Sequence, residues 1–163
     1  MCSGTKCPTP NGKWLAFVSG RYGNPHIFRA TISTDSKTRG IRLKDTSRLT
    51  YRGWYNTTPA WSPNSEDIAF SSFDNDIQRF DIFVMNNAGK SLRRLTLAYG
   101  DSENPTWSPN GQLIMFNSNR IEGSKHRGPS KLYIMNKDGS NQRPIRIDGI
   151  YAAYSPKWSR AIY

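Results

Sequence analysis

The chain has 163 residues, enough for one ordinary domain, and its 12% aromatic content is too high for a disordered polypeptide. Its formal net charge of +11 raises the possibility of a nucleic-acid or other polyanionic partner. The Lys and Arg residues are scattered without a long run, however, so we favour a generally basic surface over a nucleic-acid site. No apolar run approaches the length of a membrane-spanning helix, and no signal peptide is visible at the N-terminus.

The two cysteines, Cys2 and Cys7, stand close together near the N-terminus. A disulfide, two free thiols or a remnant of cloning would each fit this spacing. Two cysteines without a further Cys or His cluster do not form a zinc site. The sequence therefore predicts no metal and no cofactor.

A sequence motif repeats along the chain. Residues 59–65 match residues 105–111, and residues 48–50 match residues 94–96, both with a shift of 46 residues. Further copies of parts of the repeat stand at residues 10–19, 81–86, 131–136 and 156–159. A period in this range indicates a repeat architecture, which decides the fold before any single element does.

Each repeat predicts four short strands and no helix. In the second repeat we expect strands at about residues 57–62, 67–72, 80–86 and 92–96. Turn residues interrupt the chain every eight to twelve positions, and no window keeps a helical period. Four strands in units of this length are typical of blades of a β-propeller, so we predict an all-β propeller of four-stranded antiparallel blades.

The repeats define the expected domain organisation. Residues 1–9 are predicted to end a first inner strand, and residues 10–163 are predicted to form a partial propeller. Its blade units are expected at about residues 10–52, 53–98 and 99–149, followed by a final inner strand at residues 150–163. Propellers usually have four or more blades, so about three do not close a ring. Either the chain is the C-terminal part of a longer protein, which we favour, or two copies associate to complete the ring.

The alternation of antiparallel strands predicts which loops share a face of the disc. Connections between units lie on the same side as the loops that join the second strand of each unit to its third. We call this side the connection face; its predicted segments are residues 20–26, 52–56, 74–79, 98–104, 119–130 and 148–154.

Catalysis is not predicted. The only histidines, His26 and His126, fall in predicted loops, where we expect them to be exposed to solvent. No Gly-x-Ser-x-Gly elbow is present, and no Gly-rich phosphate loop precedes a helix. Asp101 and Glu103 form the strongest candidate pair for Ca²⁺, but no loop carries enough alternating oxygen ligands to predict a metal site.

Aromatic residues divide into two groups. Trp61, Trp107 and Trp158 recur at one point of the repeat, where they would either form a stacking platform or pack between blades, and regular recurrence favours packing. Other aromatic residues fall in predicted loops and are better candidates for binding: Tyr22, Trp54, Tyr55, Tyr99, Tyr151 and Tyr154.

These repeats resemble one known family. The run Pro-x-Trp-Ser-Pro-Asn-Gly at residues 105–111, the run Leu-Tyr-Ile-Met-Asn-x-Asp-Gly-Ser at residues 132–140 and the Arg-Leu-Thr at residues 94–96 are similar to the TolB-type propeller repeat. The phrases at residues 55–61 and 102–105 strengthen the resemblance, which covers nearly the whole chain from Pro10. It implies a non-enzymatic, periplasmic six-bladed propeller with a separate N-terminal domain, which binds the peptidoglycan-associated lipoprotein Pal.

The resemblance also implies where a partner binds. The family's binding positions lie just before Pro-x-Trp, which in this chain are Asn56, Thr57, Thr58, Ser102, Glu103 and Asn104. From the loop aromatics we add Tyr55, Tyr151 and Tyr154 as candidate binding residues. A TolA-like protein would contact the N-terminal region of the family, which this sequence does not include.

Two alternative functions stay open. The chain is also similar in pattern to the propeller of a prolyl-oligopeptidase-like peptidase, in which case a hydrolase domain would carry the chemistry. The positive charge suggests a polyanion-binding propeller, whose affinity would fall steeply with salt.

Overall fold

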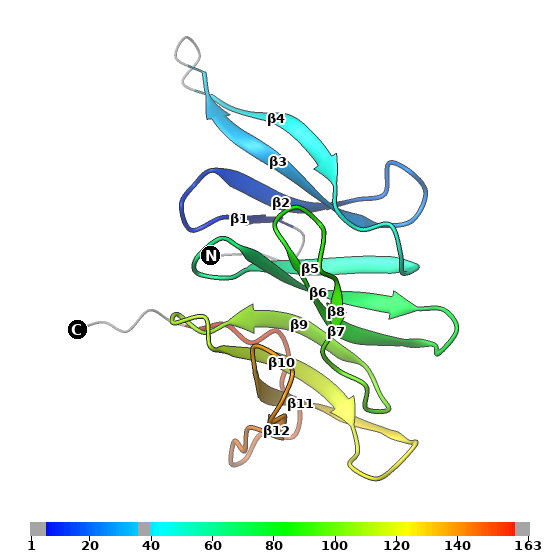
Figure 1. The fold of residues 1–163 in the computed structure, drawn as a ribbon. Coiled ribbons are helices and arrows are strands. Elements are labelled where there is room, and N and C mark those ends of the chain that lie inside the picture. The colour runs from blue at the N-terminus through cyan, green and yellow to red at the C-terminus, as the bar shows by residue number, and fades with distance from the viewer. Residues whose placement is uncertain (1–5, 36–39, 159–163) are drawn as a thin grey trace, which may run out of the picture.

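The computed structural model describes residues 6–35 and 40–158, and all regular structure in them is β-strand. The strands form three four-stranded antiparallel sheets, each in sequence order (Figure 1). The first holds β1 (Lys6–Pro8), β2 (Trp14–Ser19), β3 (His26–Thr34) and β4 (Ile41–Arg48). The second holds β5 (Tyr55–Trp61), β6 (Asp67–Asp74), β7 (Arg79–Asn86) and β8 (Arg93–Arg94), and the third holds β9 (Ser102–Trp107), β10 (Leu113–Arg120), β11 (Arg127–Asn136) and β12 (Arg143–Pro144).

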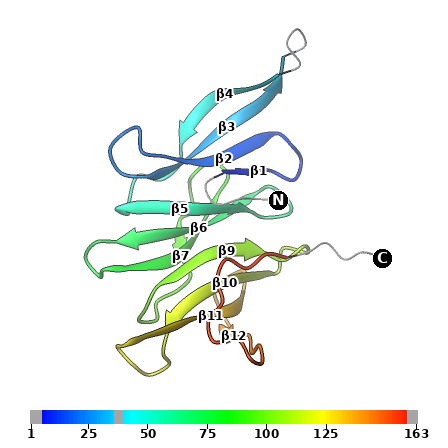
Figure 2. The same cartoon turned by 180° about the vertical axis from the view of Figure 1, so that it is seen from behind.

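The three sheets pack face to face as blades, with the second between the other two (Figures 1 and 2). Beyond β12 the chain turns back along the third sheet, where the backbone N–H of Ala153 donates to the carbonyl oxygen of Ser130 at 2.9 Å. This arrangement confirms the predicted all-β, partial propeller of four-stranded antiparallel blades. Residues 1–5 of the predicted N-terminal segment and residues 159–163 of the predicted final strand lie outside the described residues.

Alternation along the middle strands explains why the blades stack. On β6, Ile68 and Phe70 belong to the core between the first and second sheets, whereas Ala69 belongs to the core between the second and third. Successive side chains of a strand point to opposite faces, so a nearly continuous apolar strand serves two interfaces at once. The middle sheet is buried on both faces because neighbours cover both.

The recurring tryptophans hold neighbouring blades together. Trp61 is 6% exposed, and its indole N–H donates to the carbonyl oxygen of Cys7 at 2.9 Å. Trp107 is 7% exposed and donates to the carbonyl oxygen of Ala60 at 3.1 Å. Both contacts cross from one sheet to the sheet before it, so the interblade interpretation is confirmed for these two. Trp158 is half-buried, and its indole N–H has no hydrogen-bond partner among the described residues.

The Ser-Pro-Asn part of the repeat builds the turn after each inner strand. The Ser62 hydroxyl accepts the backbone N–H of Asp67 at 2.9 Å, and the Ser108 hydroxyl accepts the backbone N–H of Leu113 at the same distance. Gly111 takes a φ of 69°, a left-handed conformation that glycine adopts at little cost. The serine thus closes the hairpin on the side opposite the connection face.

Cys7, on β1, is fully buried and disulfide-bonded. The free-thiol interpretation therefore does not apply to Cys7, while Cys2 lies outside the described residues. Nowhere in the described part of the chain is there a helix with the length and apolar character needed to cross a membrane.

Candidate partner-binding site on the connection face

A kink in the backbone recurs just before each copy of Pro-x-Trp, next to the predicted binding residues. Thr58, Asn104 and Ser155 each precede the proline of Pro-x-Trp, and their φ angles are 50°, 55° and 49°. Positive φ is uncommon for residues other than glycine, so three equivalent examples mark a built feature of the repeat. The hydroxyl of Ser71 joins two of the kinks, because it lies 2.7 Å from Thr58 Oγ1 and accepts the backbone N–H of Asn104 at 3.1 Å.

Two of the predicted binding residues are fully buried. Asn56 is 1% exposed, and its amide donates to the carbonyl oxygen of Arg52 at 2.9 Å. Ser102 is 0% exposed, and its hydroxyl lies 3.3 Å from Ser118 Oγ. Each side chain thus lies at the start of an inner strand, and its polar group hydrogen-bonds within the protein.

The residues that follow them are partly accessible. Thr57, Thr58, Glu103 and Asn104 are half-buried, and the Asn104 amide donates to Asn117 Oδ1 at 2.9 Å. Burial raises the pKa of the Glu103 carboxyl, and the negative charge of Asp101 raises it further. Glu103 is therefore the one acidic group of the predicted set whose protonation the site perturbs.

The structure brings part of the predicted set together. Glu103 and Tyr154 line one cavity of about 140 Å³, with Asp101 also in its wall. Tyr151 lines a neighbouring hollow of about 470 Å³ formed by β11 and residues 144–153. Tyr154 and Tyr151 are 66% and 82% exposed, so their rings are available to a partner. Thus the third blade gathers an acidic group and two exposed tyrosines.

The second-blade residues adjoin that group at Thr58, which Ser71 links to Asn104. Tyr55 is 42% exposed and packs edge-on against Phe80, with ring centroids 6.1 Å apart. The cavity and the hollow of the third blade contain no residue of the Tyr55–Thr58 segment. The predicted site is therefore a row across two blades.

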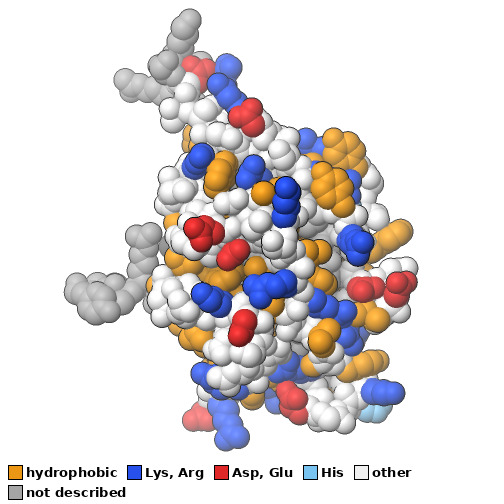
Figure 3. Space-filling model, in the orientation of Figure 1, with side chains coloured by type: hydrophobic (Ala, Val, Ile, Leu, Met, Phe, Trp, Pro, Cys, Tyr) orange, Lys and Arg blue, Asp and Glu red, His pale blue; other side chains and the backbone are white. Residues whose placement is uncertain are grey.

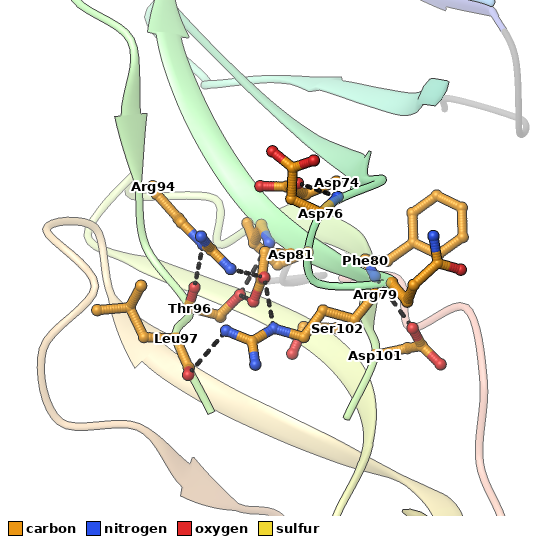
Figure 4. Close-up of polar contacts among 12 residues, drawn as sticks. Asp74, Asp76, Arg79, Phe80, Asp81, Arg94, Thr96, Leu97, Asp101 and Ser102 are labelled. Atoms are coloured by element: carbon orange, nitrogen blue, oxygen red, sulfur yellow. Dashed lines mark hydrogen bonds and ion pairs between the residues drawn. The ribbon is translucent and has the colours of Figure 1, made fainter. Parts of the chain in front are cut away.

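Asp101 fixes the connection face between the second and third blades. Its carboxylate accepts the backbone N–H of Phe80 at 3.0 Å (Figure 4) and pairs with Arg127 Nη1 at 3.1 Å. Arg127 also donates to the carbonyl oxygen of Gln78 at 2.7 Å. Asp101 was a candidate ligand for Ca²⁺, and these contacts already use its carboxylate. Among the described residues, no group of three His, Cys, Asp or Glu side chains is arranged to hold a metal ion.

The expectation for His26 is wrong. It begins β3, is only 6% exposed, and its Nδ1 lies 3.2 Å from Thr50 Oγ1 and 3.1 Å from Asn56 Nδ2. Burial lowers the pKa of His26, and the positive charge of Arg48 lowers it further. The ring is a structural link between the first and second blades. His126, by contrast, is exposed as expected.

Asp81 takes the corresponding place in the second sheet (Figure 4). It is 1% exposed, accepts the hydroxyl of Thr96 at 2.7 Å, and pairs with Arg79 at 3.0 Å and with Arg94. The sequence contained a signal for the contact of His26 with Thr50 and for that of Asp81 with Thr96. Each residue precedes Ile-Phe, and each meets the threonine of an Arg-Leu-Thr copy.

Much of the positive charge serves internal contacts. Arg29 Nη1 donates to the carbonyl oxygen of Asn87 at 2.5 Å, and Arg48 Nε donates to that of Thr50 at 2.7 Å. On the face shown in Figure 3, Lys and Arg side chains are interspersed with acidic and apolar ones. On this face the distribution does not form the basic stripe that a polyanion site needs.

Comparison with known proteins identifies the family of the chain. The family model for the TolB beta propeller domain matches residues 6–162. The chain belongs to this family. The structure of TolB from Acinetobacter baumannii is similar with a TM-score of 0.67 and 24% identity, covering 96% of this chain and 35% of that protein. That of a putative TolB from Agrobacterium tumefaciens has a TM-score of 0.71 and 25% identity, covering 93% and 48%. The chain thus spans between a third and a half of these TolB structures.

More distant structures share only the fold. An oligogalacturonate lyase in complex with manganese has a TM-score of 0.56 and 15% identity, covering 87% of this chain and 40% of that one. The AtxE2 isopeptidase, at 12% identity, is a second example. None of the curated proteins matches the sequence.

Proposed function

We propose that this TolB-family chain is a non-enzymatic, periplasmic docking scaffold that binds a Pal-like peptidoglycan-associated lipoprotein through the connection face. Membership of the TolB family supports this proposal. The observation that carries it is the arrangement at the third blade, where Glu103 and the exposed Tyr154 share a cavity beside the exposed Tyr151. Exposed tyrosines beside a polar group are typical anchors of protein interfaces.

A rigid base supports this surface. Asp101 joins β7, β10 and the start of β11 through Phe80, Asn119 and Arg127. These contacts fix the backbone next to Glu103, so ordering this part of the surface costs little conformational entropy on binding.

The test is calorimetric titration of the 163-residue chain with the soluble domain of a Pal-like lipoprotein. We expect saturable binding, and we expect Tyr151→Ala and Tyr154→Ala each to weaken it by about tenfold, which is ~1.4 kcal/mol. The control is Ile41→Ala on β4, an equally conspicuous apolar side chain that is 74% exposed but outside the connection face. Unchanged affinity in both tyrosine variants would reject the proposed surface.

A further inference from the structure

An aromatic pair recurs on the second and third strands of every sheet. Its members stand opposite each other in register and stack with ring centroids 5.7 to 5.9 Å apart: Phe17 with Phe28, Phe70 with Phe83, and Phe116 with Tyr133. The three pairs are therefore equivalent positions of the repeat, and their surroundings can be compared directly.

In the first and third sheets an arginine covers this pair. It stands four residues after the first ring in both cases. The guanidinium carbon of Arg21 lies 4.7 Å from the centroid of Phe28, and that of Arg120 lies 4.0 Å from the centroid of Tyr133. A cation held over an aromatic face at this distance is attracted by the negative face of the ring.

The third sheet shows how the arginine is held when it is buried. Arg120 is 7% exposed, its Nη1 donates to Gln142 Oε1 at 2.6 Å, and its Nε lies 3.1 Å from Glu122 Oε1. A ring, a carboxylate two residues further along the chain and an amide oxygen from the turn before β12 therefore surround the guanidinium, and its Nε makes no hydrogen bond among the described residues. The chain fills this site with its own side chain.

The second sheet has an aspartate at the arginine position. Asp74 stands four residues after Phe70, and Asp76 stands where the third sheet has Glu122. The backbone N–H of Asp76 donates to Asp74 Oδ1 at 2.9 Å, and Figure 4 shows the two carboxyl groups side by side. Next to them is a cavity of about 710 Å³, whose wall includes Phe70 and Phe83. The ring and the carboxylate are kept, and the residue at the arginine position is a second carboxylate. The cation over this ring is Arg94, whose guanidinium carbon lies 5.9 Å from the centroid of Phe83.

We propose that this cavity binds the guanidinium group of an arginine side chain presented by a partner polypeptide. The guanidinium stacks on Phe83 and pairs with Asp74 and Asp76. A planar guanidinium both stacks on a ring and donates several hydrogen bonds, whereas an ammonium group does only the second well. The proposal goes beyond the proposed Pal-like partner and does not depend on it.

Two arginines of the chain, Arg52 and Arg94, also line this cavity. The guanidinium of Arg94 is paired with Asp81, and it lies farther from the centroid of Phe83 than Arg21 and Arg120 lie from their rings. The first sheet has Arg48 at the equivalent place, where it donates to Thr50 as Arg94 donates to Thr96. Arg48 and the stacked Arg21 occur in the same sheet, so the repeat already accommodates both cations.

The size of the cavity and its rim favour a polypeptide. A guanidinium fills only a small part of about 710 Å³. Tyr51 and Trp54 also line the cavity and are 73% and 57% exposed, so they are available to the residues that flank an arginine. Exposed aromatic side chains around a buried anchor are typical of peptide-binding surfaces.

The test is calorimetric titration of the 163-residue chain with the peptide acetyl-Gly-Arg-Gly-amide. Lysine and citrulline versions of the peptide separate charge from shape, and we expect affinity to fall from arginine to lysine to citrulline. Asp74→Asn and Asp76→Asn should each weaken arginine binding by about tenfold, the range of a lost charge-assisted contact. Asp45→Asn is the matched control, because Asp45 is exposed on β4 and does not line the cavity.

Asp74→Arg tests most directly whether a guanidinium fits over this ring. Its guanidinium should cover Phe83 as Arg21 and Arg120 cover their rings, so peptide binding should disappear while the melting temperature stays equal or rises. The proposal is overturned if the wild-type chain does not bind the arginine peptide at millimolar concentration, or if the citrulline peptide binds equally well. It is also overturned if both asparagine variants keep wild-type affinity, a result that counts even where Asp74→Arg does not fold.

Discussion

The second and third blades share one repeat but secure their outer strands differently. In the second blade, Asp81 on β7 pairs with Arg94 on β8 and accepts the hydroxyl of Thr96 in the segment after β8. The third blade has the exposed Lys131 at the position of Asp81 and instead buries Arg120 against the ring of Tyr133. The first two strands of each blade therefore meet the same packing requirements, whereas the residues that hold the outer two strands differ in chemistry from blade to blade.

The largest loss of stability should come from a tryptophan of the inner strands. Trp107→Ala removes a buried indole and its hydrogen bond to Ala60, so we expect a loss of about 3–5 kcal/mol in the free energy of unfolding, measured by urea denaturation. Trp158→Ala is the matched comparison: its indole is half-buried and its N–H is unpaired, so a clearly smaller loss is expected. Equal losses would contradict the assignment of Trp107 as the tighter interblade anchor.

An intermediate effect should come from the outer network. Asp81→Asn removes the charge that accepts from Thr96, Arg79 and Arg94, and we expect a loss of about 2–3 kcal/mol. Lys131→Gln at the equivalent exposed position should stay within about 0.5 kcal/mol. Denaturation curves of the two variants, collected together, measure the difference between the blades. A loss at Lys131 as large as that at Asp81 would show that the outer strands are not secured differently.

A pH-dependent effect should come from the contact between the first and second blades. Because the folded-state pKa of His26 is lowered by burial, the unfolded chain binds the proton more tightly. The stability that neutral His26 provides is complete above the unfolded pKa and falls as the pH drops through that value toward the folded pKa. Urea denaturation at pH 7.5 and 5.5 should therefore show a larger loss for the wild type than for His26→Gln. Parallel losses would exclude His26 as the cause.

The smallest effect on stability should come from the connection face. The raised pKa of Glu103 means that the folded state favours its protonated form, so ionisation costs stability as the pH rises through the unfolded pKa. Glu103→Gln should consequently be slightly more stable than the wild type at pH 7 and indistinguishable from it at pH 3.5, as judged by thermal melting. A variant that is less stable at pH 7 would indicate that the Glu103 carboxylate makes a favourable contact.

The fold could be predicted from the sequence because its signals are local and repeated. Pro-x-Trp-Ser-Pro-Asn-Gly encodes the inner strand, the interblade indole and the turn in consecutive residues, and Trp107 and Ser108 play these roles in the structure. Apolar residues on consecutive positions of β6 and β7 similarly required cover on both faces.

The site was harder to predict because the direction of a side chain depends on contacts that the local pattern does not show. Asn56 and Ser102 each stand three residues before the proline of Pro-x-Trp, and both are buried against polar groups of the protein. His26 was expected in a loop because its neighbours Asn24 and Pro25 are turn residues. Its burial follows from Thr50 and Asn56, which lie 24 and 30 residues away and could not be paired with it from local pattern.

The central claim is that the connection face of the third blade binds the partner while the repeat's tryptophan and turn hold the fold. Hydrogen exchange of the chain with and without the soluble domain of a Pal-like lipoprotein tests this directly. We predict added protection at residues 101–104 and 150–155, with none at residues 108–111 and 136–141 on the opposite side. Protection confined to the opposite turns, or no change at residues 101–104 and 150–155 when the partner is saturating, would contradict the account.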